Sequence, residues 1–395
     1  MKFPSLLVSL VPIACLLAAC EKPPAPAKPP TTTPIPTPVP EPDDPLAIRM
    51  GVFLPLTGNQ ATFGQTALNG AALAVAQINA AGGVLGHPIR LIVRDTRSEA
   101  GISAGEVRDL ITRERVSALI GEMTSDRSME AAPVAGELRI PMVSPASTHS
   151  DLTKDSPWVF RVCFVDTFQG KVMSKFARSI GVTRAAILSD EASAYSTGLA
   201  EAFEKDFTAQ PGAVVIRESY PHGTTDFTAQ LKALGEKKPE VIFLPAYYVE
   251  AAAIIRQARP LGLDIPFIGT DGWESPDFLK AGGDAVGNSY FATHFSTGEK
   301  SARTTGFTNA YREKFQSEPS ALSALAYDAV GFVADAIVRA GTTDAEPLRA
   351  AMAGTTSYPG VTGDIDLDAE RNPSKPAIVI RVEEGKFTYL ETVKP

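Results

Sequence analysis

Short apolar runs alternate with longer amphipathic segments from residue 48 onward, and this alternation predicts the elements of the fold. Each run is brief and is followed by Gly, Pro or polar residues, which is typical of buried strands. The predicted strands cover residues 48–54, 88–95, 116–121, 140–144, 184–189, 213–219, 240–245 and 265–269.

The segments between the runs have the period of a helix. Two of them, "TALNGAALAVAQINAAGG" and "YVEAAAIIRQARPLG", place apolar residues three and four positions apart and end at Gly. Strand–helix alternation predicts parallel sheets with helices on both faces, and right-handed crossovers make such sheets doubly wound. The pattern occurs twice, before and after about residue 165. We therefore predict an α/β fold of two doubly wound parallel-sheet lobes with a ligand cleft between them.

Polar residues follow two of the predicted strands in the first half of the chain. "VSALIGEMTSDRS" gives Ser125 and Asp126 just before a helical pattern, where free N–H groups favour a carboxylate. The simpler alternative is that one of these residues only caps the helix. "VSPAST" gives Ala146, Ser147 and Thr148, whose carbonyls, hydroxyls and N–H groups suit a small charged ligand, although an ordinary polar loop would look similar.

Aromatic and acidic residues follow the strands of the second half. Tyr195 lies in "SDEASAYSTG", Tyr247 in "PAYYVEA" and Asp271 in "IGTDGWES". Taken singly, a Tyr usually packs in a core and an Asp before Gly usually makes a turn. Together with the anion donors of the first half, however, they predict a site for a zwitterion with an apolar side chain.

These motifs resemble the periplasmic leucine/isoleucine/valine-binding proteins, which are substrate-binding proteins of ABC transporters with the type I periplasmic binding fold. The similarity covers about residues 48–395 and includes "GVFLPLTGNQATFGQTALNGAALAVAQINAAGG", "IPMVSPASTHSDLT", "FRVCFVDTFQG", "AYSTGL" and "IIRQARPLGLDIPFIGTDGW". The resemblance implies no enzyme activity and no cofactor or metal. It implies that the protein binds a branched-chain or other apolar α-amino acid and delivers it to a permease by hinge closure.

The resemblance also assigns roles on the first lobe. Ser125 is expected to bind the ligand carboxylate through its hydroxyl and N–H groups. Thr148 is expected to donate its N–H to the carboxylate and to offer its hydroxyl to the ammonium. The Ala146 carbonyl is expected to accept from the ammonium, and Ser147 belongs to the same predicted loop site.

On the second lobe, Asp271 stands where the family places the acidic partner of the ammonium, usually a Glu. Tyr195 and Tyr247 match aromatic positions of the cleft, and Phe63 matches an aromatic that lines the side-chain pocket. The shorter Asp and the bulky Trp273 nearby depart from the family's pattern. Aromatic carboxylates and other small anions, which bind relatives of this fold, therefore remain alternative ligands.

The N-terminus predicts export and anchoring. "MKFPSLLVSLVPIACLLAAC" is too short for a membrane span and reads as a signal peptide, and its last four residues resemble a bacterial lipobox. Cleavage would leave a lipidated Cys20 that anchors the protein to a membrane on the periplasmic or cell-surface side. The Pro-rich residues that follow would form an extended tether. A plain signal peptide is the alternative.

The resemblance and these segments together predict the domain organisation. Lobe 1 and lobe 2 would be joined by three hinge crossings, near residues 165, 294 and 375. The predicted parts are 1–19 signal peptide, 20–46 lipidated Cys and tether, 47–165 plus 295–374 lobe 1, and 166–294 plus 375–395 lobe 2.

Composition narrows the possible partners. The net charge is −8 and no basic run stands out, which argues against nucleic-acid binding. Four His and three Cys argue against a zinc or disulfide framework. We expect a monomer. A ligand-sensing receptor with the same fold, or a structural or adhesive lipoprotein, would have the same composition.

Three further motifs have a simple structural explanation. "GISAG" fits a nucleophile elbow, but Ser103 falls at a helix start rather than directly after a strand. "DIDLDAERNPSK" imitates a calcium-binding loop but has Ala369 where Gly is needed and Lys375 where Glu is needed, so we predict a hairpin turn. His149 is expected to lie at the surface or behind the site.

Overall fold

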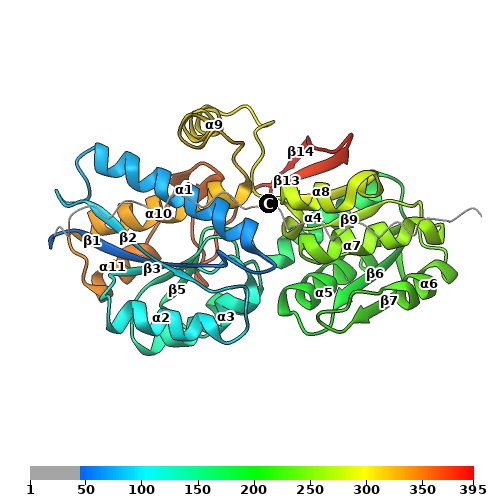
Figure 1. Cartoon of the computed structure of the whole chain (residues 1–395), viewed down its shortest axis with the longest axis horizontal. Helices are drawn as coiled ribbons and strands as arrows, with labels where there is room; N and C mark the ends of the chain where they lie inside the picture. The colour runs from blue at the N-terminus through cyan, green and yellow to red at the C-terminus, as the bar shows by residue number, and fades with distance from the viewer. Residues whose placement is uncertain (1–44) are drawn as a thin grey trace, which may run out of the picture. The chain divides into compact units, whose positions relative to one another are not determined.

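The computed structural model describes residues 45–395. The predicted signal peptide, the lipidation site Cys20 and nearly all of the Pro-rich tether lie outside the described residues. Two larger sheets and one small two-stranded sheet organise the described part (Figure 1).

The first sheet has five strands in the order β2-β1-β3-β4-β5, all parallel. The strands are β1 Ile48–Leu54, β2 Ile89–Asp95, β3 Ala118–Gly121, β4 Met142–Ser144 and β5 Val159–Arg161. The helices associated with it are α1 Ala61–Ala80, α2 Ile102–Thr112, α3 Ser125–Glu137, α10 Ala321–Ala340 and α11 Ala345–Ala353. Helix α1 packs on α10 and α2 packs on α3, which gives the predicted helix-covered sheet (Figure 1).

The second sheet has seven strands in the order β14-β13-β10-β9-β8-β6-β7. The strands are β6 Arg184–Asp190, β7 Ala213–Tyr220, β8 Val241–Phe243, β9 Phe267–Gly269, β10 Ser289–Thr293, β13 Ala377–Glu383 and β14 Lys386–Val393. The helices associated with it are α4 Asp166–Ser179, α5 Ala194–Thr208, α6 Thr228–Glu236, α7 Tyr248–Ala258 and α8 Pro276–Gly282. Strands β6 to β10 are parallel, whereas β13 and β14 add an antiparallel edge. The doubly wound prediction therefore holds for the centre of this sheet and misses its edge.

The chain passes between the two lobes three times within residues 45–395. It leaves the first sheet after β5 and enters α4, which packs on α5. After β10 it returns through α9 Ala302–Phe315 to α10, and it comes back to the second sheet at β13. These three crossings give both lobes residues from distant parts of the sequence.

Close packing of α1 on α10 fixes the first lobe. A side chain at Gly70 would place its Cβ only 1.9 Å from the Ser323 carbonyl oxygen, so α1 can approach the start of α10 this closely only without one. Helix α10 is long and apolar enough to cross a membrane, but most of it is buried inside the protein. Its apolar character thus serves the core of this lobe.

The further motifs adopt ordinary structure. Ser103 is a buried residue within α2, one residue past its start and well after the end of β2, so no nucleophile elbow forms there. The segment that imitates a calcium loop forms a turn closed by a bridge between Leu367 and Pro373, as the hairpin prediction requires. Lys375 is buried and donates to the Val162 carbonyl.

Candidate functional site

The predicted site residues lie where parallel strands of both sheets end. Helix α3, which begins at Ser125, follows β3, and the "VSPAST" loop follows β4. In the second sheet, Tyr195 lies in α5 after β6, Tyr247 lies between β8 and α7, and Asp271 follows β9. The carboxyl ends of strands are the usual ligand-binding edge of an open α/β sheet.

Residues of both lobes line one small pocket, a cavity whose roughly 230 Å³ of free space is partly open to solvent. Six of the eight predicted ligand-binding residues line it, together with three others that the sequence did not single out. The lining consists of Phe63, Met123, Ser125, Ala146 and Leu322 from the first lobe and Tyr195, Tyr247, Asp271 and Gly272 from the second. The cavity thus combines an apolar wall with a hydroxyl on one lobe and a carboxylate on the other.

Neither Ser125 nor Asp126 is the N-cap residue of α3. Thr124 is the N-cap residue, and Ser125 is the first residue of the helix. The Ser125 hydroxyl accepts the His149 N–H at 3.2 Å, which ties the helix to the loop after β4. The Asp126 carboxylate accepts from the Ser193 hydroxyl at 2.8 Å and the Ala194 N–H at 2.7 Å. The N-terminus of α3 therefore faces the cleft, where its dipole favours an anion.

The loop after β4 is held by hydrogen bonds behind the cavity. The Ser147 hydroxyl lies 2.6 Å from that of Ser128 and donates to the Glu122 carbonyl at 3.2 Å. Arg161 is fully buried and donates to the Ser147 carbonyl at 2.9 Å and to the His149 carbonyl at 2.8 Å. The side chain of Ser147 is thus engaged within its own lobe, and its role toward a ligand stays a prediction.

Thr148 is fully buried beside this network but does not line the 230 Å³ cavity. Its hydroxyl has no hydrogen-bond partner among residues 45–395. Because a buried hydroxyl without a partner costs free energy, this group has bonding capacity to offer a ligand.

Asp271 is the centre of a buried polar cluster on the second lobe. Its Oδ1 accepts from the Tyr195 hydroxyl at 2.8 Å and from Gln169 Nε2 at 3.0 Å. Its Oδ2 lies 3.1 Å from His294 Nε2. Burial lowers the pKa of His294, although Asp271 opposes that shift, so His294 acts as a neutral donor to the carboxylate. The sequence reasoning missed Gln169 and His294.

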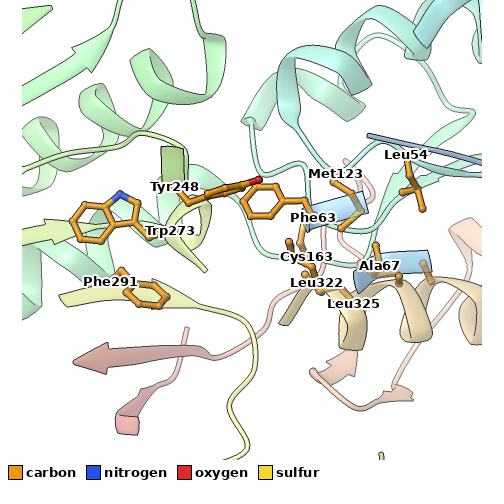
Figure 2. Packing of buried hydrophobic residues seen from close by; sticks show 14 of the residues in the cluster. Leu54, Phe63, Ala67, Met123, Cys163, Tyr248, Trp273, Phe291, Leu322 and Leu325 are labelled. Atoms are coloured by element: carbon orange, nitrogen blue, oxygen red, sulfur yellow. The ribbon is translucent and has the colours of Figure 1, made fainter. Parts of the chain in front are cut away.

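Two tyrosine rings and Phe63 form the aromatic part of the cavity. The rings of Tyr195 and Tyr247 stack with centroids 4.6 Å apart, and the edge of Phe63 meets Tyr247 at 6.1 Å. Phe63 also contacts Tyr248, which Figure 2 shows directly beside it. Trp273, in contrast, is fully buried and stacks on Phe278 at 5.1 Å, within the second lobe. Its bulk therefore does not enter the cavity.

Several hydrogen bonds cross the cleft from lobe to lobe. Besides the contact of Asp126 with the start of α5, the Tyr248 hydroxyl donates to the Asn59 carbonyl at 2.6 Å, and the Ala321 N–H donates to the Glu274 carboxylate at 2.5 Å. These bonds join the two lobes around the cavity.

His149 has a structural role at the edge of this site. It is half-buried, and its Nδ1 accepts the Asp151 N–H at 3.2 Å at the start of a short 3₁₀ helix, Ser150–Thr153. Burial lowers the pKa of His149, which favours the neutral ring.

Comparison with known proteins identifies related chains. The family model described as periplasmic binding protein matches residues 47–386. The Leu/Ile/Val-binding protein BraC3 of Rhizobium johnstonii is 31% identical over 87% of this chain and 94% of its own. The branched-chain amino acid transporter substrate-binding protein LivJ of Streptococcus pneumoniae, solved with isoleucine, is 36% identical with a TM-score of 0.84, over 88% of this chain and all of its own.

A second solved structure has a different ligand. The solute-binding protein of an ABC transporter from Rhodopseudomonas palustris, in complex with benzoate, has a TM-score of 0.80 over 88% of this chain and 97% of its own. Its sequence identity is 23%, so the likeness concerns the fold alone.

Proposed function

Because the chain belongs to the periplasmic binding protein family, we propose that it is the substrate-binding protein of an ABC transporter and that it binds an apolar, branched-chain α-amino acid. The observation that carries this proposal is the pairing of opposite recognition groups across one cavity. The first lobe presents the N-terminus of α3 with Ser125, and the second presents the Asp271 carboxylate. A zwitterion matches both at once.

The ligand carboxylate would bind to the first lobe. The Ser125 hydroxyl and N–H and the Thr148 N–H would donate to it, with the dipole of α3 adding to the attraction. The Thr148 hydroxyl and the Ala146 carbonyl would accept from the ammonium. The unpartnered state of that hydroxyl supports this role.

The ammonium would pair with Asp271. Three neutral groups already donate to this carboxyl group, and their hydrogen bonds hold it in place beside the cavity. Burying an ammonium without an anionic partner is very costly, so Asp271 should govern both affinity and selectivity.

The ligand side chain would contact the apolar wall. Phe63, Met123, Leu322 and the ring of Tyr247 supply it, and Trp273 stays in the core. The relatives named as Leu/Ile/Val-binding and the isoleucine complex of the similar LivJ protein support a branched-chain ligand for this chain.

Hinge closure would couple binding to transport. Since the ligand contacts groups on both lobes, it stabilises the closed state relative to the open one, and the permease would recognise that state. The hinges would lie near residues 165, 294 and 375, with lobes formed by 47–165 plus 295–374 and by 166–294 plus 375–395. The protein would act as a monomer outside the cytoplasm, anchored through lipid on Cys20.

A thermal-shift and calorimetric comparison tests the proposal. Ligand that binds only the native state raises the melting temperature, so L-leucine, L-isoleucine or L-valine should raise it while benzoate should not. A shift with benzoate and none with any amino acid would instead support the aromatic-acid alternative. A sensing role would be distinguished by the absence of amino-acid uptake when the protein is reconstituted with its permease.

A further inference from the structure

Asp166 is a buried carboxyl group without a hydrogen-bond partner. It is the first residue of α4, directly after the chain leaves the first sheet, and it is 2% exposed. Neither of its carboxyl oxygens accepts a hydrogen bond from any residue in the range 45–395. Buried carboxyl groups normally have such partners, so this one has two acceptors to offer.

Asp166 does not line the cavity itself, but it contacts a residue proposed to bind the ammonium on the first lobe and shares a helix with a residue that contacts Asp271 on the second. Its N–H donates to the Thr148 carbonyl at 2.9 Å, and the Thr148 hydroxyl lies close enough to its carboxyl group to oppose the rise in pKa that burial causes. Its Oδ2 faces α5, where a Cβ added at Gly198 would lie 3.4 Å away. One helical turn onward, Gln169 donates to Asp271.

The unpartnered atoms in this region are mainly acceptors, although Arg161 Nε is an unpartnered donor among them. Besides both oxygens of Asp166 and the Thr148 hydroxyl, Gln169 Oε1 has no partner among the described residues. Gln169 and Asp166 are three residues apart on α4 and therefore share one face of the helix. A group with several N–H donors would satisfy this set, and an ammonium has three of them.

The charges at this end of the cleft do not balance. Arg161 is buried and directs its guanidinium at backbone carbonyls, while Asp166 and Asp271 each bring a carboxyl group. Burial keeps Cys163 a neutral thiol by raising its pKa to about 12. Lys375 has its own counterion, Asp328, at 3.9 Å. With both carboxyl groups ionised, one negative charge is left without a partner.

We propose that Asp166 is a second carboxylate for the ligand's ammonium, facing it together with Asp271, and that this pair makes a cationic head group a requirement for binding. The inference rests on the proposed function and sharpens it. An amino acid brings the missing positive charge, whereas an acid without an amine would place a further anion beside two carboxyl groups. Burial raises the pKa of Asp166 to about 8, so its ionised form depends on a cation nearby.

Calorimetry on the protein and three variants tests this role. The variants are Asp166→Asn, Asp271→Asn and, as a matched control, Asp155→Asn at an exposed position. We expect Asp166→Asn to lower the affinity for L-leucine and for L-leucinol, both of which carry the ammonium, at least tenfold. The affinities of Asp155→Asn for both ligands should stay within twofold of the wild-type values. Affinity for 4-methylpentanoate, which lacks the amine, should not fall in Asp166→Asn.

Two outcomes overturn the inference. One is leucine affinity within twofold of wild type in a folded Asp166→Asn protein, and the other is an equal loss for all three ligands, which indicates a structural role. If Asp166→Asn does not fold, Asp166→Ser, which also removes the charge, takes its place with the same expected and contradicting results. Failure of the proposed function is recognised separately, since wild type would then bind no amino acid.

Discussion

The two lobes contribute to the cleft in different ways. On the first lobe, the groups offered to a ligand are backbone N–H and carbonyl groups and small hydroxyls, held by a network of Ser128, Ser147 and Arg161 behind them. On the second lobe they are an ionisable carboxylate and stacked tyrosine rings. Under the proposed function, the first lobe would hold the carboxylate and part of the ammonium, and the second would supply the anionic partner of the ammonium, so neither lobe would hold the whole ligand alone.

The largest effect should come from removing the charge of the second lobe. We expect Asp271→Ala to lower the affinity for L-leucine more than tenfold, because the ammonium loses its partner and Tyr195, Gln169 and His294 lose their acceptor. Isothermal titration calorimetry measures this. Unchanged affinity would show that Asp271 does not bind the ligand, and it would contradict the proposed difference between the two lobes.

A substitution on the first lobe should lower the affinity less, because backbone groups there also bind the ligand carboxylate. Ser125→Ala keeps the N–H and loses only the hydroxyl, so affinity should fall about fivefold, in line with a net value of about 1 kcal/mol for one hydrogen bond. Ser147→Ala is the matched control. It should lower the free energy of unfolding in urea by about 1 kcal/mol and leave affinity within twofold, because its hydroxyl bonds within the lobe. Equal losses of affinity in both variants would show that Ser147 also faces the ligand.

The smallest effect concerns a contact between the lobes. Burial raises the pKa of Glu274, which accepts from the Ala321 N–H, to about 7. Between pH 4.5 and 7 the folded state therefore binds more protons than the unfolded state, and stability should decline as pH rises through this window. Glu274→Gln cannot titrate, so its unfolding free energy should change less from pH 5 to pH 8, by on the order of 1 kcal/mol. Parallel pH profiles of variant and wild type would contradict this.

The sequence pattern predicted the centres of both sheets but not their edges. All eight predicted strands form, because each is a parallel strand whose sequence contains a short apolar run followed by polar or turn residues. Strands β5 and β10 were missed, since their few apolar residues lack a distinctive period. The antiparallel β13 and β14 were missed because the helix-linked pattern that predicts parallel strands does not apply to a C-terminal hairpin.

Site residues were predictable where they follow a predicted strand. Ser125, Tyr247 and Asp271 stand in that position, and the structure brings them to one cavity. His294 follows the unpredicted strand β10, and Asp166 and Gln169 lie on α4, a helix whose contact with the site depends on the crossing between lobes. Only the folded chain shows which buried polar groups lack partners.

The hydrogen bonds that span the cleft away from the cavity have a consequence for how binding strength can vary. Two of them are the bond from the start of α5 to Asp126 and the bond from Tyr248 to Asn59. They favour the arrangement with both lobes in contact, whichever ligand occupies the cavity. Changes at such rim positions would scale the dissociation constants of all guests by one common factor. Affinity can therefore change through the residues at the rim of the cleft, while ligand specificity is determined by the residues that line the cavity.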